Sequence, residues 1–199
     1  MKFDASIVQT QISSPLGDMV LGATRQGLAG AWFTDQRHRP ESLDFKNVPH
    51  PWLRDDAHPV LQQATRQLNE FFSGKRQQFD MPLDISGGTE FQQSVWQALL
   101  RIGHGHLSSY GEIARQISNP AAVRAVGMAV GRNPLGVIIP CHRVLGSDGS
   151  LTGYAGGLHR KTWLLAHEGA GVFMPDAKSK SSTDQATASA RHQAQGSLI

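Results

Sequence analysis

Residues 109–130 have the sequence SYGEIARQISNPAAVRAVGMAV, which contains the signals for two short helices. Ser109 is followed three residues later by Glu112, the spacing of a capping box that opens a helix. Asn119 and Pro120 supply an N-cap and a first-turn proline for a second helix over the rest of the stretch. Two short helices joined by a tight turn are typical of a helix-turn-helix, so we expect that motif here.

The second of these helices has an unusual outward face. A predicted core stripe is formed by three valines, Val123, Val126 and Val130. The other face carries small or apolar side chains and one cation, namely Ala121, Arg124, Ala125 and Met128. Short side chains beside a single long cation suit a close approach to a nucleic-acid groove. A helix packed within the protein, with Arg124 in solvent, is the alternative interpretation.

The chain has one cysteine, Cys141, in the stretch IPCHRV at residues 139–144. A single cysteine excludes an intramolecular disulfide and a cysteine-rich zinc site. A free thiol has a pKa of about 8.5, so a nucleophile here needs a base or a positive environment, and His142 could be that base. We expect a short apolar strand at residues 137–139, after which direct contact of the two side chains requires a turn or a water. A buried cysteine beside an unrelated histidine is the alternative.

Three other polar residues each allow two interpretations. Glu168 ends a predicted helix over residues 158–167, where the helix dipole disfavours an acid; it either orients His142 as the third member of a triad or lies in solvent. Tyr110 is either a core aromatic or a group that reaches a ligand. Asn133, which precedes a proline, has the position of a turn residue.

The first third of the chain predicts a small sheet covered by one helix. Alternating apolar residues indicate strands around residues 7–8, 19–21 and 28–33, and again at 79–85. Apolar residues at helical spacing predict a helix over residues 59–72. The stretch SGG at 86–88 is typical of a linker, and Thr89 with Gln92 then repeats the capping-box spacing. We therefore divide the chain into domains at 1–86 and 87–173, and a tail at 174–199 that we expect to be disordered.

Composition limits the partners and the location. The formal net charge of +3 and the pI of about 9.3 are compatible with a polyanionic partner. The sequence lacks both an apolar run of about 20 residues and a signal-peptide core, so we expect no membrane contact and a cytoplasmic protein, or a nuclear one in a nucleated cell. His38, His50 and His58 lie near two aspartates but lack regular ligand spacing, so we expect no metal.

Six motifs together resemble the O6-alkylguanine-DNA alkyltransferases. They are SSYGEIA at 108–114, RAVG at 124–127, RNP at 132–134, PCHRV at 140–144, GYAGGL at 153–158 and WLLAHEG at 163–169. Their order and spacing agree over about residues 89–169, whereas the N-terminal part agrees only in pattern. The resemblance implies an α/β (α+β) fold, with a small ribonuclease-H-like sheet-plus-helix domain followed by a helical domain that has a winged helix-turn-helix-like DNA-binding element.

The resemblance also implies a reaction. Members of that family repair DNA as stoichiometric methylated-DNA–protein-cysteine methyltransferases, moving a methyl or other alkyl group from O6-alkylguanine irreversibly to their own cysteine, with O4-alkylthymine as an open second substrate. Carried over, Cys141 is the nucleophile and acceptor, His142 its base through a water, and Glu168 the orienting acid. Tyr110 would protonate guanine N3, and Asn133 would brace the turn that holds the site. No cofactor is implied.

DNA contacts follow from the same resemblance. Arg124 would fill the space left by a base rotated out of the duplex, with its helix in the minor groove. Further residues implied in DNA or substrate binding are Ala121, Ala122, Ala125, Gly127, Val144, Tyr154, Ala155, Gly156 and Lys161. Some relatives have Ser at position 155, so Ala155 predicts an altered substrate preference. The implied partner is double-stranded DNA containing O6-alkylguanine, bound by a monomer. A non-catalytic alkylated-DNA-binding protein, a thiol hydrolase and a helix-turn-helix transcription regulator are the alternatives.

Overall fold

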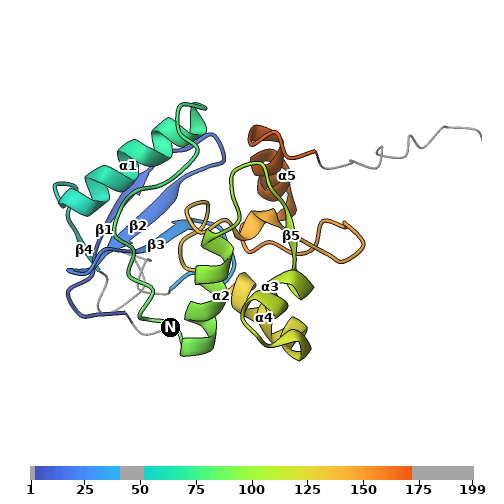
Figure 1. Ribbon diagram of the computed structural model, residues 1–199. Coiled ribbons are helices and arrows are strands. Elements are labelled where there is room, and N and C mark those ends of the chain that lie inside the picture. The colour runs from blue at the N-terminus through green and yellow to red at the C-terminus, as the bar shows by residue number, and fades with distance from the viewer. Residues whose placement is uncertain (1–2, 41–51, 172–199) are drawn as a thin grey trace, which may run out of the picture.

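The computed structural model describes residues 3–40 and 52–171. The predicted tail at 174–199 and His50 therefore lie outside the described residues. Within the described part, a four-stranded sheet and one helix precede a mainly helical region (Figure 1). This arrangement confirms the predicted fold class.

The N-terminal sheet has the strand order β3-β2-β1-β4. Strands β1 (Val8–Ile12), β2 (Met19–Ala23) and β3 (Leu28–Phe33) are antiparallel, as the alternating pattern predicted. The short β4 (Leu53–Arg54), which was not predicted, pairs parallel with β1. Every residue of β2 and β3 is buried, because α1 covers one face of the sheet and aromatic side chains cover the other.

Helix α1 (Pro59–Phe72) has the predicted bounds. Its buried positions, among them Leu61, Leu68 and Phe71, recur at helical spacing and face the sheet. The predicted strand at 79–85 is wrong: only an isolated bridge joins Leu83 to Leu28. Pro82 precedes that bridge and has no N–H to donate, which limits a regular ladder.

The C-terminal region is built from α2 (Glu90–Leu100), α3 (Tyr110–Gln116), α4 (Val123–Gly131) and α5 (Leu158–His167). Both predicted capping boxes are present, at Thr89 with Gln92 and at Ser109 with Glu112. A 3₁₀ turn, Pro120–Ala122, links α3 to α4, so the second helix of the pair begins later than predicted. The Asn119 side chain makes no cap hydrogen bond.

The buried stripe of α4 differs in one residue from the prediction. It consists of Val126, Ala129 and Val130, whereas Val123 is 40% exposed. Val123 is the first residue of the helix, whereas the buried Ala129 and Val130 lie in its last turn. The apolar character of the outward face is therefore greater than the sequence pattern predicted.

Hydrogen bonds of Ala31 and Phe71 are among the contacts that fasten the N-terminal region to the C-terminal region. Ala31 in β3 donates its N–H to the Pro134 carbonyl at 2.8 Å and accepts from the Gly136 N–H at 3.0 Å. His167 in α5 lies 2.7 Å from the Phe71 carbonyl at the end of α1. One continuous hydrophobic core includes side chains from both regions. The segment that leads to Cys141 is thus held directly against the sheet.

Among the described residues, no helix is both long enough and apolar enough to cross a membrane.

Candidate active site

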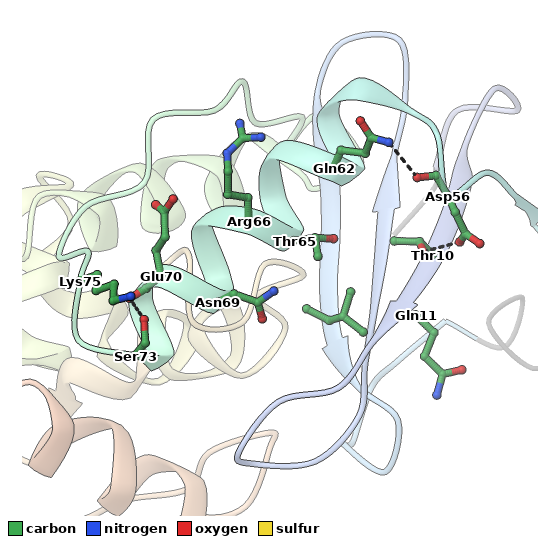
Figure 2. Close-up of a pocket in the computed structure, with 11 residues that line it drawn as sticks. Thr10, Gln11, Asp56, Gln62, Thr65, Arg66, Asn69, Glu70, Ser73 and Lys75 are labelled. Atoms are coloured by element: carbon green, nitrogen blue, oxygen red, sulfur yellow. Dashed lines mark hydrogen bonds between the residues drawn. The ribbon is translucent and has the colours of Figure 1, made fainter.

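A cavity of about 630 Å³ lies beside α1, between the helix and β1 (Figure 2). Most of its lining residues are of polar types, among them Thr10, Asp56, Arg66 and Glu70. Neither a cysteine nor a histidine is among the lining residues. We therefore place the candidate chemistry elsewhere, around Cys141.

The residues just before Cys141 form a tight turn. The predicted strand at 137–139 is therefore wrong. Val137 has φ of 72°, in the left-handed region that a β-branched side chain rarely adopts. The buried Asn133 side chain holds this turn: its amide nitrogen donates to the Ile139 carbonyl at 2.8 Å, and its oxygen accepts from the Leu135 N–H at 3.0 Å. These side-chain hydrogen bonds within residues 133–139 therefore override the β propensity of the sequence.

Cys141 begins a one-turn 3₁₀ helix, Cys141–Arg143, and is 7% exposed. The Asn133 amide nitrogen lies 3.1 Å from its Sγ. Burial raises the pKa of the Cys141 thiol, and this outweighs the opposing effects of the Asn133 hydrogen bond and the positive charge of Lys161. The resting thiol is therefore protonated at neutral pH, and a reaction at this sulfur needs a base.

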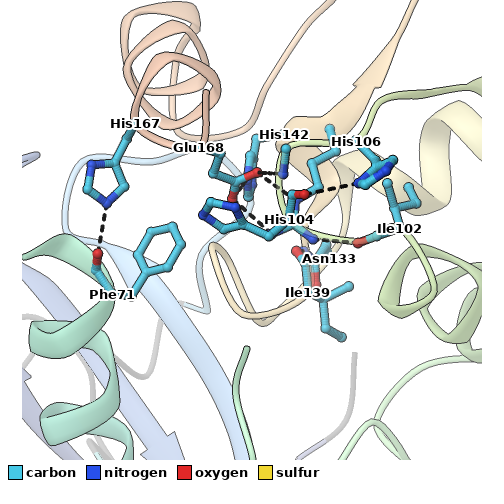
Figure 3. A network of polar contacts seen from close by, with 11 residues as sticks. Phe71, Ile102, His104, His106, Asn133, Ile139, His142, His167 and Glu168 are labelled. Carbon is cyan, nitrogen blue, oxygen red and sulfur yellow. Dashed lines mark hydrogen bonds and ion pairs between the residues drawn. The ribbon is translucent and has the colours of Figure 1, made fainter. Parts of the chain in front are cut away.

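His142 and Glu168 supply the geometry of a base and its orienting acid. His142 Nε2 lies 2.8 Å from Glu168 Oε1, and Figure 3 shows the two side chains pointing toward one another. Both side chains are fully buried. His142 Nδ1 is also buried and has no hydrogen-bond partner among the described residues. The second ring nitrogen is thus left available for a proton.

The charges of this pair follow from its surroundings. Burial lowers the pKa of His142, although the hydrogen bond to Glu168 opposes this effect. Burial would raise the pKa of Glu168, but hydrogen bonds from His142 and Arg143 outweigh it and bring the pKa to about 2. The resting state is therefore a neutral imidazole that donates its Nε2 proton to a carboxylate. This tautomer leaves Nδ1 as an acceptor.

Arg143 is a site residue that the sequence analysis did not single out. Its Nε and Nη2 donate to the two Glu168 carboxylate oxygens at 2.8 and 2.9 Å, and its Nη1 donates to the Ile102 carbonyl. Buried arginines require a partner acid, and Glu168 is that partner here, a pairing that sequence spacing does not indicate. The Gly105 N–H also approaches Glu168, at 3.4 Å.

A pair of short strands places Tyr110 close to the turn that contains Cys141. Strands β5 (Ser108–Ser109) and β6 (Val144–Leu145) are parallel, which brings the start of α3 next to the residues that follow Cys141. The Tyr110 hydroxyl lies 2.8 Å from the Thr152 hydroxyl. A Cβ added to Gly127 in α4 would contact the Tyr110 ring at 3.8 Å, so the ring and this helix are neighbours.

Lys161 differs from its predicted role. It is 1% exposed, and its ammonium donates to the Val144 and Thr152 carbonyls at 2.5 and 3.3 Å. Burial lowers its pKa to about 8, although the negative charge of Cys141 in its thiolate form opposes this. Contact of Lys161 with DNA is not supported by this placement, because protein encloses the ammonium. Instead the ammonium holds the backbone carbonyls of Val144 and Thr152 in place.

The loop at residues 154–156 includes Tyr154, which packs against the hydrophobic core that contains Cys141. Burial raises the pKa of Tyr154 well above its usual value, and the nearby Cys141 adds to the effect. The Ala155 and Gly156 carbonyls accept hydrogen bonds from the Arg37 N–H at 3.1 Å and from Arg160 Nη1 at 2.8 Å. A Cβ on Gly156 would lie 2.7 Å from the Tyr154 ring, so a larger residue there would displace the ring.

The outward face of α4 and its preceding turn has the predicted small and apolar residues, with the exposed Val123 in addition. Ala121 and Arg124 are exposed, and Ala122, Ala125 and Gly127 are partly buried. Met128 is 64% exposed. No ion pair of Arg124 is found within the part of the chain that the structure describes. The face is thus apolar with one cation available to a partner.

Residues 3–40 and 52–171 contain no group of three or more His, Cys, Asp or Glu side chains that could hold a metal ion. His50, one of the three histidines weighed as ligands, lies outside these ranges.

Comparison with known proteins gives consistent matches along the chain. Residues 7–85 match the ribonuclease-like domain of 6-O-methylguanine DNA methyltransferase, and residues 90–170 match the DNA binding domain of the same family. A methylated-DNA–protein-cysteine methyltransferase of Methanosarcina acetivorans is 44% identical over 78% of this chain and 94% of its own length. A methylated-DNA–protein-cysteine methyltransferase of Mycobacterium tuberculosis is 44% identical over 79% of this chain and 89% of its own length. The crystal structure of Mycobacterium tuberculosis OGT in complex with DNA superposes with a TM-score of 0.69, at 44% identity, over 79% of this chain and 90% of that one.

Proposed function

The chain belongs to the 6-O-methylguanine DNA methyltransferase family, and we propose that it uses Cys141 to take the alkyl group from O6-alkylguanine in DNA. The observation that carries this proposal is the arrangement around the sulfur. The only cysteine of the chain directly precedes a buried histidine whose Nε2 binds a carboxylate and whose Nδ1 has no partner in residues 3–40 and 52–171. This is the order of nucleophile, base and orienting acid that a thiol displacement requires.

The first step of the proposed reaction activates the thiol. A water between Cys141 and His142 carries the thiol proton to Nδ1, and the imidazolium that results is stabilised by Glu168 at 2.8 Å. The raised pKa of Cys141 makes this base necessary. The nearby Lys161 ammonium and the Asn133 amide favour the thiolate once it forms.

The second step transfers the alkyl group. The thiolate attacks the alkyl carbon, the new S–C bond forms as the C–O6 bond breaks, and the bonding electron pair stays with guanine. Tyr110 donates a proton to guanine N3, so the leaving group departs as a neutral base. The loop at residues 154–157 forms a wall of the pocket and offers backbone donors toward O6, with the Cys141 and Val144 backbones beside the base edge.

A guanine stacked in duplex DNA cannot present its O6 substituent to a buried sulfur, so the nucleotide has to rotate out of the helix. Arg124, exposed at the start of α4, would fill the space that the base leaves. The small face of Ala121, Ala122 and Ala125 would allow α4 to approach a minor groove closely. Helix-turn-helix proteins usually place the second helix in the major groove, and the short side chains favour the other mode here.

The product is a thioether, which the described site has no means to hydrolyse, so each molecule acts once. A thiol hydrolase with a Cys-His-Glu triad would instead release many products, and a lesion-binding protein would not need the thiol. We further propose a monomer with domains at 1–86 and 87–173 that acts in the cytoplasm, or in the nucleus of a nucleated cell. The family matches at 7–85 and 90–170 support that division.

Mass spectrometry tests the proposed function. After incubation with duplex DNA that contains O6-methylguanine, the peptide with Cys141 should carry one methyl group in place of one hydrogen, and the DNA should contain unmodified guanine in equal amount. Cys141→Ser is the control and should repair nothing. An unmodified peptide with unrepaired DNA would contradict the proposal, and several repaired guanines per protein would indicate a hydrolase.

A further inference from the structure

The hydroxyl groups of Tyr110 and Thr152 lie 2.8 Å apart, although 42 residues separate them in the chain. Tyr110 is the first residue of α3, and Thr152 lies in the loop between β6 and α5. Both side chains are partly buried. Nothing in the comparisons with known proteins assigns a role to Thr152, and the reaction steps above do not use it.

The two hydroxyls have different capacities for hydrogen bonding. A phenol has one proton, and in the proposed function that proton goes to guanine N3. The phenolic oxygen is then an acceptor toward Thr152, whose hydroxyl has one proton to donate. Within the described residues, Thr152 Oγ1 has no other hydrogen bond. The direction of the contact is therefore fixed once Tyr110 acts as the proton donor.

The framework around Thr152 keeps this contact in place. The Thr152 carbonyl accepts from the buried Lys161 ammonium, which also binds the Val144 carbonyl. Ser109, directly before Tyr110, pairs with Leu145, directly after Val144. The loop and the start of α3 are thus tied to the same short strand, and the distance between the two hydroxyls depends on packing rather than on a free loop.

We propose that Thr152 is a positioning residue for Tyr110, an inference that depends on the proposed function. Its hydroxyl donates to the phenolic oxygen, directs the phenol proton toward the base, and stabilises the negative charge that remains after transfer. The guanine gains the Tyr110 proton and keeps the electrons of the broken C–O6 bond. The Tyr110 phenolate then takes up a proton from solvent. The His142 imidazolium releases to solvent the proton that it took from the thiol. No further reactant is needed.

A double-mutant cycle tests this inference. The rate of methyl transfer from saturating O6-methylguanine duplex is measured in single-turnover conditions for Thr152→Val, Thr152→Ser, Tyr110→Phe and the double variant Tyr110→Phe with Thr152→Val. Removing a donor to a developing charge should slow Thr152→Val about tenfold, or about 1.4 kcal/mol in the barrier, with duplex affinity unchanged. Thr152→Ser should stay within about twofold of the wild type, since it keeps the hydroxyl. In the Tyr110→Phe background, Thr152→Val should have no further effect.

Thr65→Val on α1 makes the same chemical change far from the site and serves as the matched control (Figure 2). A Thr152→Val rate equal to that of the wild type would overturn the inference. An equal loss of rate from Thr152→Val in the wild-type and Tyr110→Phe backgrounds would also overturn it, since Thr152 would then act without Tyr110. If Thr152→Val does not fold, Thr152→Ala takes its place in the cycle. Failure of the proposed function is distinguishable, because the wild-type Cys141 peptide would then stay unmodified.

Discussion

Glu168 Oε1 lies 2.8 Å from His142 Nε2 in the protein interior, although the two residues are 26 positions apart. The same carboxylate binds Arg143 through both of its oxygens. One anion therefore orients the imidazole next to the nucleophile and neutralises a buried guanidinium. Because these two functions share a single side chain, stability and reactivity should change together when it is altered.

Glu168→Gln tests this coupling. The substitution keeps the size of the side chain but leaves Arg143 buried without its counterion, so the free energy of unfolding should fall by about 3–5 kcal/mol. Methyl transfer should slow by on the order of a hundredfold, because a neutral amide does not stabilise the imidazolium. Denaturant unfolding and single-turnover rates measure the two effects.

Glu70→Gln on α1 is the control for this substitution. Glu70 pairs with Arg76 at 2.7 Å, but both side chains are partly exposed, so its loss should cost less than about 1 kcal/mol. Equal destabilisation by the two substitutions would contradict the importance of the buried carboxylate.

His142 should make stability depend on pH. Its folded pKa is lowered from the ordinary value of 6.5, so below that pH the unfolded chain binds a proton that the folded protein does not. The stabilisation is therefore complete above about pH 6.5 and declines as the pH falls through the lowered value. Denaturant unfolding between pH 8 and pH 5 measures it. His142→Gln should show a smaller loss of stability over this range, and parallel curves would show that another group is responsible.

Asn133→Ala should weaken the turn before Cys141. The buried Leu135 N–H would lose its partner, at a cost of about 1–3 kcal/mol, whereas the Ile139 carbonyl would keep the Cys141 N–H as a donor. The pKa of Cys141 should rise further, because the amide hydrogen bond to Sγ opposes the effect of burial. The pH at which a thiol reagent reacts with half-maximal rate reports that pKa. An unchanged unfolding midpoint and pH profile would show that the turn does not need Asn133.

Local signals in the sequence predicted the helices. The capping pairs at Thr89 and Ser109 and the apolar spacing in residues 59–72 depend on neighbours within a few positions, and the structure has all three features. The strand predicted at 137–139 depended on β propensity alone. There, hydrogen bonds from Asn133, which the sequence analysis placed in a turn, and a left-handed Val137 extend the turn over residues that β propensity assigned to a strand.

The site was only partly accessible from the sequence. The motifs pointed to Cys141, His142 and Glu168, and the fold does bring Glu168 onto His142. Arg143 was not singled out, because its role depends on the carboxylate that folding brings to it from 25 positions away. For Lys161, the resemblance implied contact with DNA or substrate. Its actual carbonyl partners lie on β6 and the following loop, a contact that sequence spacing does not predict.

Arg124→Ala should separate base rotation from chemistry. Arg124 is exposed at the start of α4, outside the buried network of His142 and Glu168, so its removal should not alter the thiol or its base. If it fills the space left by the rotated base, its loss should slow repair of duplex DNA by roughly ten- to a hundredfold, since rotation costs a few kcal/mol. Reaction with free O6-benzylguanine, which needs no rotation, should change by less than about twofold by the same argument. Arg66→Ala on α1 removes an exposed cation far from the helix-turn-helix and should affect neither substrate (Figure 2). Equal losses on duplex and free base would exclude a role for Arg124 in base rotation.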